Sequence, residues 1–175
     1  LEELDKLCDL ELKIITSNVS FNWEVGKPNI KNLIIRRWDI NTVKEELLGC
    51  DIGIIPNLTP LSFTELALET SVSLGLYDTD HIVRMKNKSN AGRCFVFHQL
   101  GIPVVADFTP SNFHILGDPR CGFIALNKQS WIKSVLKLSD HKTRQFIAYN
   151  AKKEFDRLYD PKSWALRLYN SIEEI

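Results

Sequence analysis

The residues best suited to bind a charged ligand lie in the segment from Arg84 to Asp107. Basic side chains gather at its start, where Ser89 and Asn90 can cap the helix that follows. The free N–H groups and the positive dipole end of such a helix start attract anions. Gly92 lets a ligand approach the backbone closely, and Arg93 adds a fork of hydrogen-bond donors. The pattern therefore predicts an anion site, suited to a diphosphate, at the start of this helix.

Two of these features also have a purely structural interpretation. A lysine-rich loop before a capped helix is often only a solvated loop. Asp107 follows a predicted strand, where residues that contact ligands often lie, but it could equally cap the turn at Pro110. The residue spacing leaves both interpretations open.

Five short apolar runs predict the strands that would position this segment. They are rich in β-branched residues and lack polar alternation, which is typical of a parallel sheet covered on both faces. The predicted strands are Leu12–Thr16, Asn32–Arg36, Asp51–Ile55, Ile102–Ala106 and Gly122–Leu126.

Helical periodicity fills most of the intervals between these runs. The predicted helices are Thr42–Leu48, Asn90–Leu100, Gln129–Leu138, Thr143–Leu158 and a final helix from Pro161. Alternation of strands and helices predicts an α/β fold with a Rossmann-like, doubly wound parallel sheet. Trp131 and Trp164 are expected to pack in the core or between helices.

The segment between Pro56 and Met85 interrupts this alternation. Leu61–Ser73 has helical spacing, and connections this long are usually functional or contain a further element. Asp78-Thr79-Asp80 forms a DxD tripeptide whose two carboxylates are of the kind that hold a divalent metal ion, but an acidic loop is the simpler interpretation. The four histidines lack the spacing of metal ligands, so we expect structural roles for His81, His98, His114 and His141.

Composition narrows the class of protein. A length of 175 residues predicts a single domain over 1–175, and a formal net charge of zero argues against nucleic acid as a partner. The four cysteines lie far apart without a CxxC pair, which argues against a disulfide scaffold and predicts a cytoplasmic location. No apolar run approaches the ~18 residues that span a bilayer. The start at Leu1 rather than Met predicts a piece of a longer protein.

An ordered series of motifs resembles the C-terminal domain of GT-B glycosyltransferases, in particular the family 4-like enzymes (glycosyl transferases group 1). Gly101-Ile102-Pro103-Val104-Val105 is similar to the G-x-P-V-V of that family. The likeness extends through most of the chain in the same order, at Cys50–Pro56 (CDIGIIP), Cys121–Phe123 (CGF), Arg144–Lys152 (RQFIAYNAK) and Tyr159–Tyr169 (YDPKSWALRLY).

The resemblance implies a domain that binds a nucleotide-diphosphate sugar. The sugar would pass to a saccharide or lipid-linked acceptor, as in a hexosyltransferase of surface polysaccharide synthesis. Lys88 and Arg93 would neutralise the diphosphate, so no metal or other cofactor is expected. The predicted donor-binding residues are Lys86, Lys88, Ser89, Asn90, Gly92, Arg93 and Asp107, and no catalytic residue is assigned.

The sequence departs from the family at two positions. Where the family carries two glutamates eight residues apart, this chain has Lys88 and Val96. The second glutamate normally accepts hydrogen bonds from the ribose hydroxyls, and a valine cannot do so. Three explanations stay open: another residue holds the ribose, the donor binds differently, or the domain has lost its activity.

The resemblance also implies partners and leaves alternatives. Acceptor binding would belong to an N-terminal domain of the same protein, so this piece alone is expected to be inactive. Peripheral membrane association of the full-length protein is a further expectation. One alternative is a GT-B enzyme of the nucleotide-sugar 2-epimerase type, which needs carboxylates and a histidine near the diphosphate. The other is a non-catalytic module that binds a sugar nucleotide or a protein.

Overall fold

The computed structural model describes residues 1–19, 27–56 and 92–173. In chain order the elements are α1 (Glu2–Asp5), β1 (Glu11–Thr16), β2 (Asn32–Arg37), α2 (Val43–Leu48), β3 (Gly53–Ile55), α5 (Gly92–Gln99), β4 (Val104–Asp107), α6 (Pro110–Leu116), β5 (Phe123–Ala125), α7 (Lys128–Ser139), α8 (His141–Leu158) and α9 (Pro161–Glu173). The five predicted strands and five predicted helices all form, with described ends within two residues of the predicted ones. The predicted helix Leu61–Ser73 lies outside the described residues.

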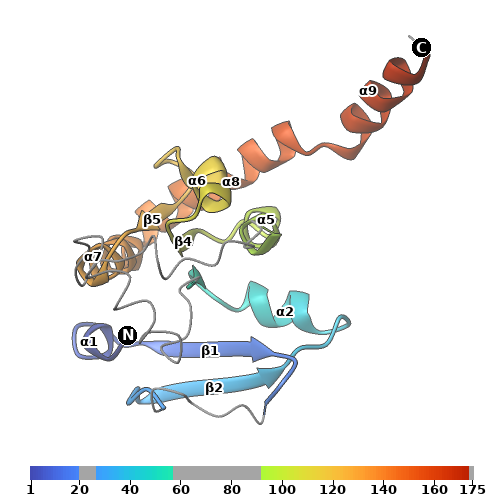
Figure 1. Ribbon diagram of the computed structural model, residues 1–175. Helices are drawn as coiled ribbons and strands as arrows, with labels where there is room; N and C mark the ends of the chain where they lie inside the picture. The colour runs from blue at the N-terminus through green and yellow to red at the C-terminus, as the bar shows by residue number, and fades with distance from the viewer. Residues whose placement is uncertain (20–26, 57–91, 174–175) are drawn as a thin grey trace, which may run out of the picture.

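The strands form two small parallel sheets (Figure 1). One pairs β1 with β2, with Leu12 opposite Leu33. The other has the order β3-β4-β5, with Gly53 opposite Val104 and Val105 opposite Phe123. The α/β class with parallel strands is therefore confirmed. The described residues divide the strands between two sheets, whereas the sequence predicted one.

Strand β4 is the centre of the larger sheet, and all four of its residues are buried. Because successive side chains of a strand point to opposite faces, its apolar residues divide between two clusters. Val104 and Ala106 pack with Cys94 of α5 and Leu116 of α6. These two helices therefore cover one face of the sheet.

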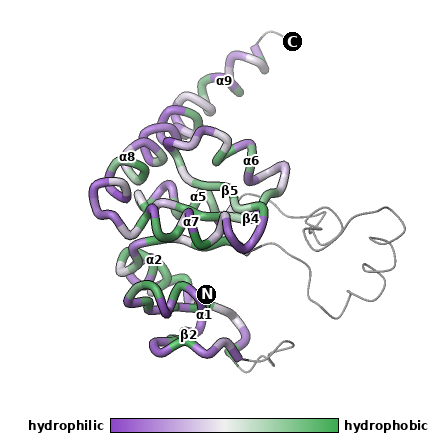
Figure 2. Tube along the Cα trace, turned by 90° about the vertical axis from the view of Figure 1, so that its left-hand side faces the viewer, coloured by the Kyte–Doolittle hydropathy of each residue, from purple (hydrophilic) through white to green (hydrophobic). Residues whose placement is uncertain are grey.

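The opposite face of the sheet is covered by α7 and α8. Val105 packs there with Leu138 of α7 and Ile147 of α8, and Leu4 of α1 joins the same cluster. Figure 2 shows hydrophobic segments gathered where α5, α7, β4 and β5 lie together. The unalternating apolar run of β4 is explained by this burial on both faces.

Helix α5 ends in a Schellman turn that directs the chain into β4. Gly101 has a φ of 71°, a left-handed conformation that favours glycine. Its N–H donates to the carbonyl of His98, and the N–H of Ile102 donates to the carbonyl of Phe97. Pro103 follows, as is common after such a helix end. The Gly-x-Pro of the sequence motif is thus a helix stop and a strand start.

The smaller sheet is tied to the larger one through α1 and through ion pairs. Lys128 of α7 pairs with Glu3 of α1, and Arg144 of α8 pairs with Asp51 at 3.1 Å. Helix α2 lies along β1, where the ammonium of Lys13 is 3.0 Å from a carboxylate oxygen of Glu46. Glu3 and the buried Leu4 of α1 thus join the two sheets in one body, whereas the Arg144–Asp51 pair lies within the part that contains the larger sheet, since Asp51 directly precedes β3.

Helix α9 extends away from that body (Figure 1), and all its described residues are exposed. Trp164 was predicted to pack in the core or between helices. A place in the core is wrong, because its side chain is 51% exposed, but its indole N–H does contact the end of α8 by donating to the carbonyl of Leu158. The apolar stripe of α9 predicted burial, but no described element covers it. Trp131, in contrast, packs against the core as predicted. Among the described residues no helix is long and apolar enough to cross a membrane.

Gly122 provides a test of how tightly the sheet and α6 are packed. It has a φ of 157°, and a Cβ there would lie 2.9 Å from the carbonyl oxygen of Val104 and 2.7 Å from Leu116. Since the strand cannot move away, we expect Gly122→Ala to lower the free energy of unfolding by about 1–3 kcal/mol in urea titrations. Gly49→Ala is the matched control, because its nearest neighbours are 3.8 Å away. Equal effects of the two substitutions would contradict this packing.

Candidate functional site

The carboxyl edge of the β3-β4-β5 sheet contains a buried polar network centred on Asn112. This residue is fully buried on α6. Its side-chain N–H donates to the carbonyl of Asp107 at 2.9 Å, and its side-chain oxygen accepts from the thiol of Cys94 at 3.4 Å. The network therefore connects the first turn of α5 to the end of β4.

The side chain of Asp107 is held inside the protein. Its exposed fraction is 1%, and Oδ1 accepts a 2.7 Å hydrogen bond from the indole N–H of Trp131 on α7. The cap of α6 is Thr109, whose side chain accepts from the N–H of Asn112. Asp107 was predicted either to touch a ligand or to cap this turn. The side chain of Asp107 binds the indole of Trp131 inside the protein, and the capping hydrogen bond of α6 belongs to Thr109.

The sequence did not predict α6 or the role of Asn112. Thr109-Pro110-Ser111-Asn112 resembles a turn, because each of these residue types is common in turns. The same residues are also a helix-start signal, since Thr is a good N-cap and Pro suits the first helical turn. That second signal could have identified the helix from the sequence.

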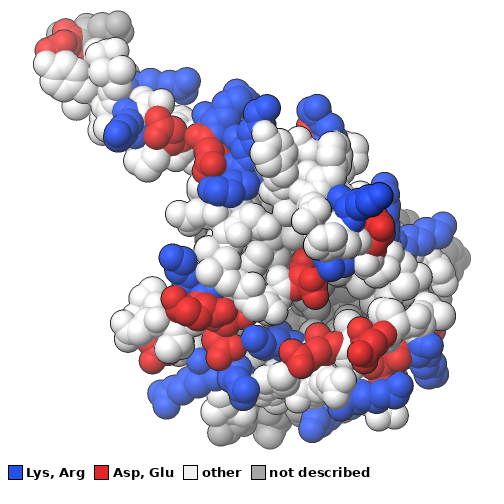
Figure 3. Space-filling view, turned by 180° about the vertical axis from the view of Figure 1, so that it is seen from behind, with Lys and Arg blue, Asp and Glu red and all other residues white. Residues whose placement is uncertain are grey.

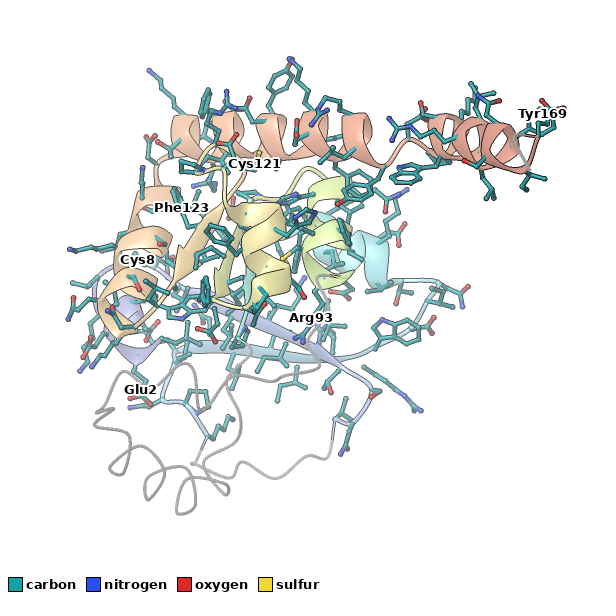
Figure 4. The ribbon with its side chains drawn as sticks, turned by 45° about the horizontal axis from the view of Figure 1, so that its top comes forward. Glu2, Cys8, Arg93, Cys121, Phe123 and Tyr169 are labelled. Carbon is teal, nitrogen blue, oxygen red and sulfur yellow. The ribbon has the colours of Figure 1, made fainter. Side chains whose placement is uncertain are left out.

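The predicted donor-binding residues lie in or before the first turn of α5. Gly92 and Arg93 form that turn, whereas Lys86, Lys88, Ser89 and Asn90 lie outside the described residues. Because α5 runs back to the start of β4, its own start lies toward the carboxyl edge of the sheet. Figure 4 shows Arg93 at one end of the α5–α6 layer and Cys121 at the other.

Arg93 and Val96 lie on the solvent-facing side of α5. Both are exposed, with Val96 at 44%, and residues three apart are neighbours on a helix surface. In the family 4-like GT-B enzymes that the sequence resembles, the position of Val96 carries a glutamate that binds the ribose. The side chain at this position therefore faces outward, where it could meet a ligand, and is not part of the core.

Cys94 is not suited to act as a nucleophile. Burial raises the pKa of its thiol to about 12, although the charge of Arg93 acts in the opposite direction. The reactive form of cysteine is the thiolate, so at neutral pH this group remains a thiol that donates to Asn112. All four cysteines lie in the described residues and are free.

No metal site is visible in the part of the chain that the structure describes. There, no group of three or more His, Cys, Asp or Glu side chains could hold an ion. His114 and His141 are exposed, and His98 is buried. The Asp78-Thr79-Asp80 tripeptide and His81 fall outside the described residues.

A second basic group lies at the end of β2. Arg36, Arg37 and Trp38 line an open hollow of about 570 Å³ together with Glu46 of α2. Glu46 lies 3.7 Å from Arg36, which offsets part of the positive charge. Figure 3 shows basic and acidic side chains interspersed over one face of the molecule, without a single basic field.

Comparison with family models, curated proteins and solved structures gives no match for this chain.

The hydrogen bond between Trp131 and Asp107 can be tested by a pair of like substitutions. Trp131→Phe removes the indole donor, so the buried carboxylate of Asp107 loses this hydrogen bond. We expect the free energy of unfolding, measured by urea titration, to fall by about 1.5–3 kcal/mol. Trp164→Phe removes an indole donor from an exposed site and should cost less than about 1 kcal/mol. A larger loss for Trp164→Phe would contradict the importance of the buried pair.

Proposed function

We propose that this chain is the donor-binding domain of a GT-B glycosyltransferase, with a Rossmann-like arrangement of its parallel sheet. The domain would bind a nucleotide-diphosphate sugar at the start of α5, for transfer to a saccharide or lipid-linked acceptor. The observation that carries the proposal is the placement of exposed Arg93 in the first turn of a helix that starts at the carboxyl edge of a parallel sheet. In α/β sheets of this kind, ligands bind at that edge.

The electrostatics of this position suit a diphosphate. The first N–H groups of a helix have no partner within the helix, and the aligned peptide dipoles add positive potential there. Arg93 adds a guanidinium that can bind two phosphate oxygens at once. Lys86 and Lys88 precede it closely in sequence and would add further positive charge.

The same groups would assist sugar transfer. When the bond between the anomeric carbon and the diphosphate breaks, negative charge grows on the leaving phosphate. Positive groups that are already fixed in place stabilise this charge in the transition state. On this proposal the basic residues and the helix start perform the role that a metal ion has in other glycosyltransferases.

Val96 indicates how the donor would be held differently from the family pattern. An exposed valine offers the ribose an apolar contact and no acceptor. Recognition of the nucleotide would then depend more on the diphosphate than on the ribose. We therefore expect nucleoside diphosphates to bind much better than the corresponding nucleosides.

A thermal-shift screen tests the proposal. The chain is heated with UDP, GDP, CDP or ADP, with the matching nucleosides, and with the common nucleotide sugars. A ligand at 100 times its dissociation constant adds about 2.7 kcal/mol, which corresponds to a rise of about 5–10 °C in the melting temperature for a chain of this size. One base should stand out, and its nucleoside should have little effect.

Substitutions show where on the chain the nucleotide binds. Arg93→Ala should weaken diphosphate binding about tenfold or more, because a charge-assisted pair is lost. Arg167→Ala on α9 is the control, since it removes the same charge far from α5. A flat screen, or equal effects of the two variants, would reject the proposed site. Binding without sugar transfer in the full-length protein would favour the non-catalytic module.

A further inference from the structure

A cavity lies at the last turn of α5, at the opposite end of the helix from Arg93. Its volume is about 100 Å³, and it is enclosed by the ends of α5 and α6, the loop before β5, and the last two turns of α8. Cys121 marks this end of the layer in Figure 4. A single water molecule needs only about 10–15 Å³ of such a cavity, so there is room for a group of several non-hydrogen atoms.

His98 presents one unused hydrogen-bond acceptor to this cavity. Its side chain is 3% exposed, and Nε2 has no hydrogen-bond partner among the described residues. The backbone of Cys121 hydrogen-bonds the ring, and this bond must therefore be made by Nδ1. Burial lowers the pKa of His98 to about 4, so the ring is neutral at pH 7 and Nε2 carries a lone pair. Because buried polar groups are nearly always hydrogen-bonded, this lone pair calls for a donor.

The charged groups that line the cavity are already paired. Asp118 binds Arg120 at 2.7 Å, and Glu154 binds Arg157. The burial that keeps His98 neutral also disfavours a charged ligand beside its ring, since an ion loses its hydration there. A ligand that reaches Nε2 should therefore be neutral.

One wall of the cavity is apolar. Ile115, Phe155 and Leu158 line it together with the ring of Tyr159, whose centroid lies 5.4 Å from that of Phe155. Phe95 of α5 supports Tyr159 from behind, with centroids 4.6 Å apart in an edge-to-face contact. Such a wall suits a cluster of water molecules poorly, because each bound water needs about 2–4 polar partners. It suits a hydrocarbon group instead.

From this geometry we infer that the cavity binds a small neutral alcohol. The O–H group of the alcohol donates to Nε2 of His98, and its alkyl part lies against Ile115, Phe155 and Leu158. Since an apolar cavity of about 150 Å³ holds benzene, the smaller volume here suits a body of about three carbon atoms. This inference does not depend on the proposed nucleotide site.

Titration with isopropanol, acetone and isopropylammonium tests the inference, because the three compounds share one shape. Isopropanol has an O–H donor, acetone has only an acceptor, and the amine is charged. We expect isopropanol to bind with a dissociation constant on the order of 10 mM, and acetone and the amine at least about tenfold more weakly. In NMR spectra of the labelled imidazoles, the Nε2 signal of His98 should shift with the saturation curve of isopropanol.

Three results would overturn the inference. Equal responses to isopropanol and acetone would mean that Nε2 does not select a donor. Tighter binding of the amine would mean that charge decides the ligand. No saturation at isopropanol concentrations well above the expected dissociation constant would mean that water alone occupies the cavity.

His98→Leu removes the acceptor and should reduce the preference for isopropanol over acetone from about tenfold to less than about twofold, as measured on the methyl signals of Ile115. His141→Leu is the matched control, because His141 is exposed in the first turn of α8 and does not line the cavity. It should leave the preference unchanged. A folded His98→Leu variant that still prefers isopropanol as the unmodified chain does would overturn the role of Nε2.

Glu154→Gln keeps the test decisive if His98→Leu does not fold, which circular dichroism and the melting temperature show. This variant removes a charge that lines the cavity but is already paired, and should change the affinity for isopropanol by less than about twofold. A larger loss would mean that the hydroxyl binds Glu154 and not Nε2, and would overturn the inference.

Discussion

The burial of β4 on both faces is the constraint on which the rest of the structure depends. A strand of four buried residues must pair every N–H and C=O group with a neighbouring strand, which β3 and β5 provide from either side. Its side chains need an apolar layer on each face, and α5 with α6 and α7 with α8 supply them. The positions of these helices then determine which groups lie at the two ends of the sheet.

At the carboxyl end, this constraint requires every polar group inside the layer to have a partner. Asp107 is the last residue of β4 and is buried like the apolar residues before it. The indole of Trp131 and the amide of Asn112 bind its carboxylate and its carbonyl, and buried polar groups are tolerated only when they are bonded in this way. The edge beneath the proposed donor site is therefore rigid, and a ligand would meet the outer side of α5 instead of Asp107.

The fold was predictable from the sequence where local patterns and tertiary packing agree. The strands were predictable because a strand that is buried on both faces appears in the sequence as a short, unbroken apolar run. The class of α/β fold followed from their alternation with helices, and Gly101 with Pro103 gave the end of α5. A core position for Trp164 was predicted wrongly because an amphipathic stripe shows only that a helix can be buried, and no described neighbour covers α9.

The candidate sites were harder to predict from the sequence than the fold was. Arg93 could be proposed as a ligand-binding residue from the sequence because a helix start and a basic residue are neighbours along the chain. The cavity around His98 joins residues from α5, α6 and α8 that are up to 61 positions apart, between His98 and Tyr159, so no local pattern could indicate it. Asn112 was missed for a similar reason, since its partners Cys94 and Asp107 come from other elements.

Helix α5 carries both proposed sites, one at each end, and its fixation decides whether they act separately. Arg93 and His98 are five residues apart, about 7.5 Å along the helix axis, but Arg93 lies on the exposed side of α5 and His98 on its buried side. The start of the helix is fixed by the bond from Cys94 to Asn112, and its end by the Schellman turn at Gly101. A helix fixed at both ends has little freedom to shift, so each ligand should bind without altering the affinity of the other. Loss of both binding activities in one variant would therefore indicate displacement of α5 itself, and not damage to either site.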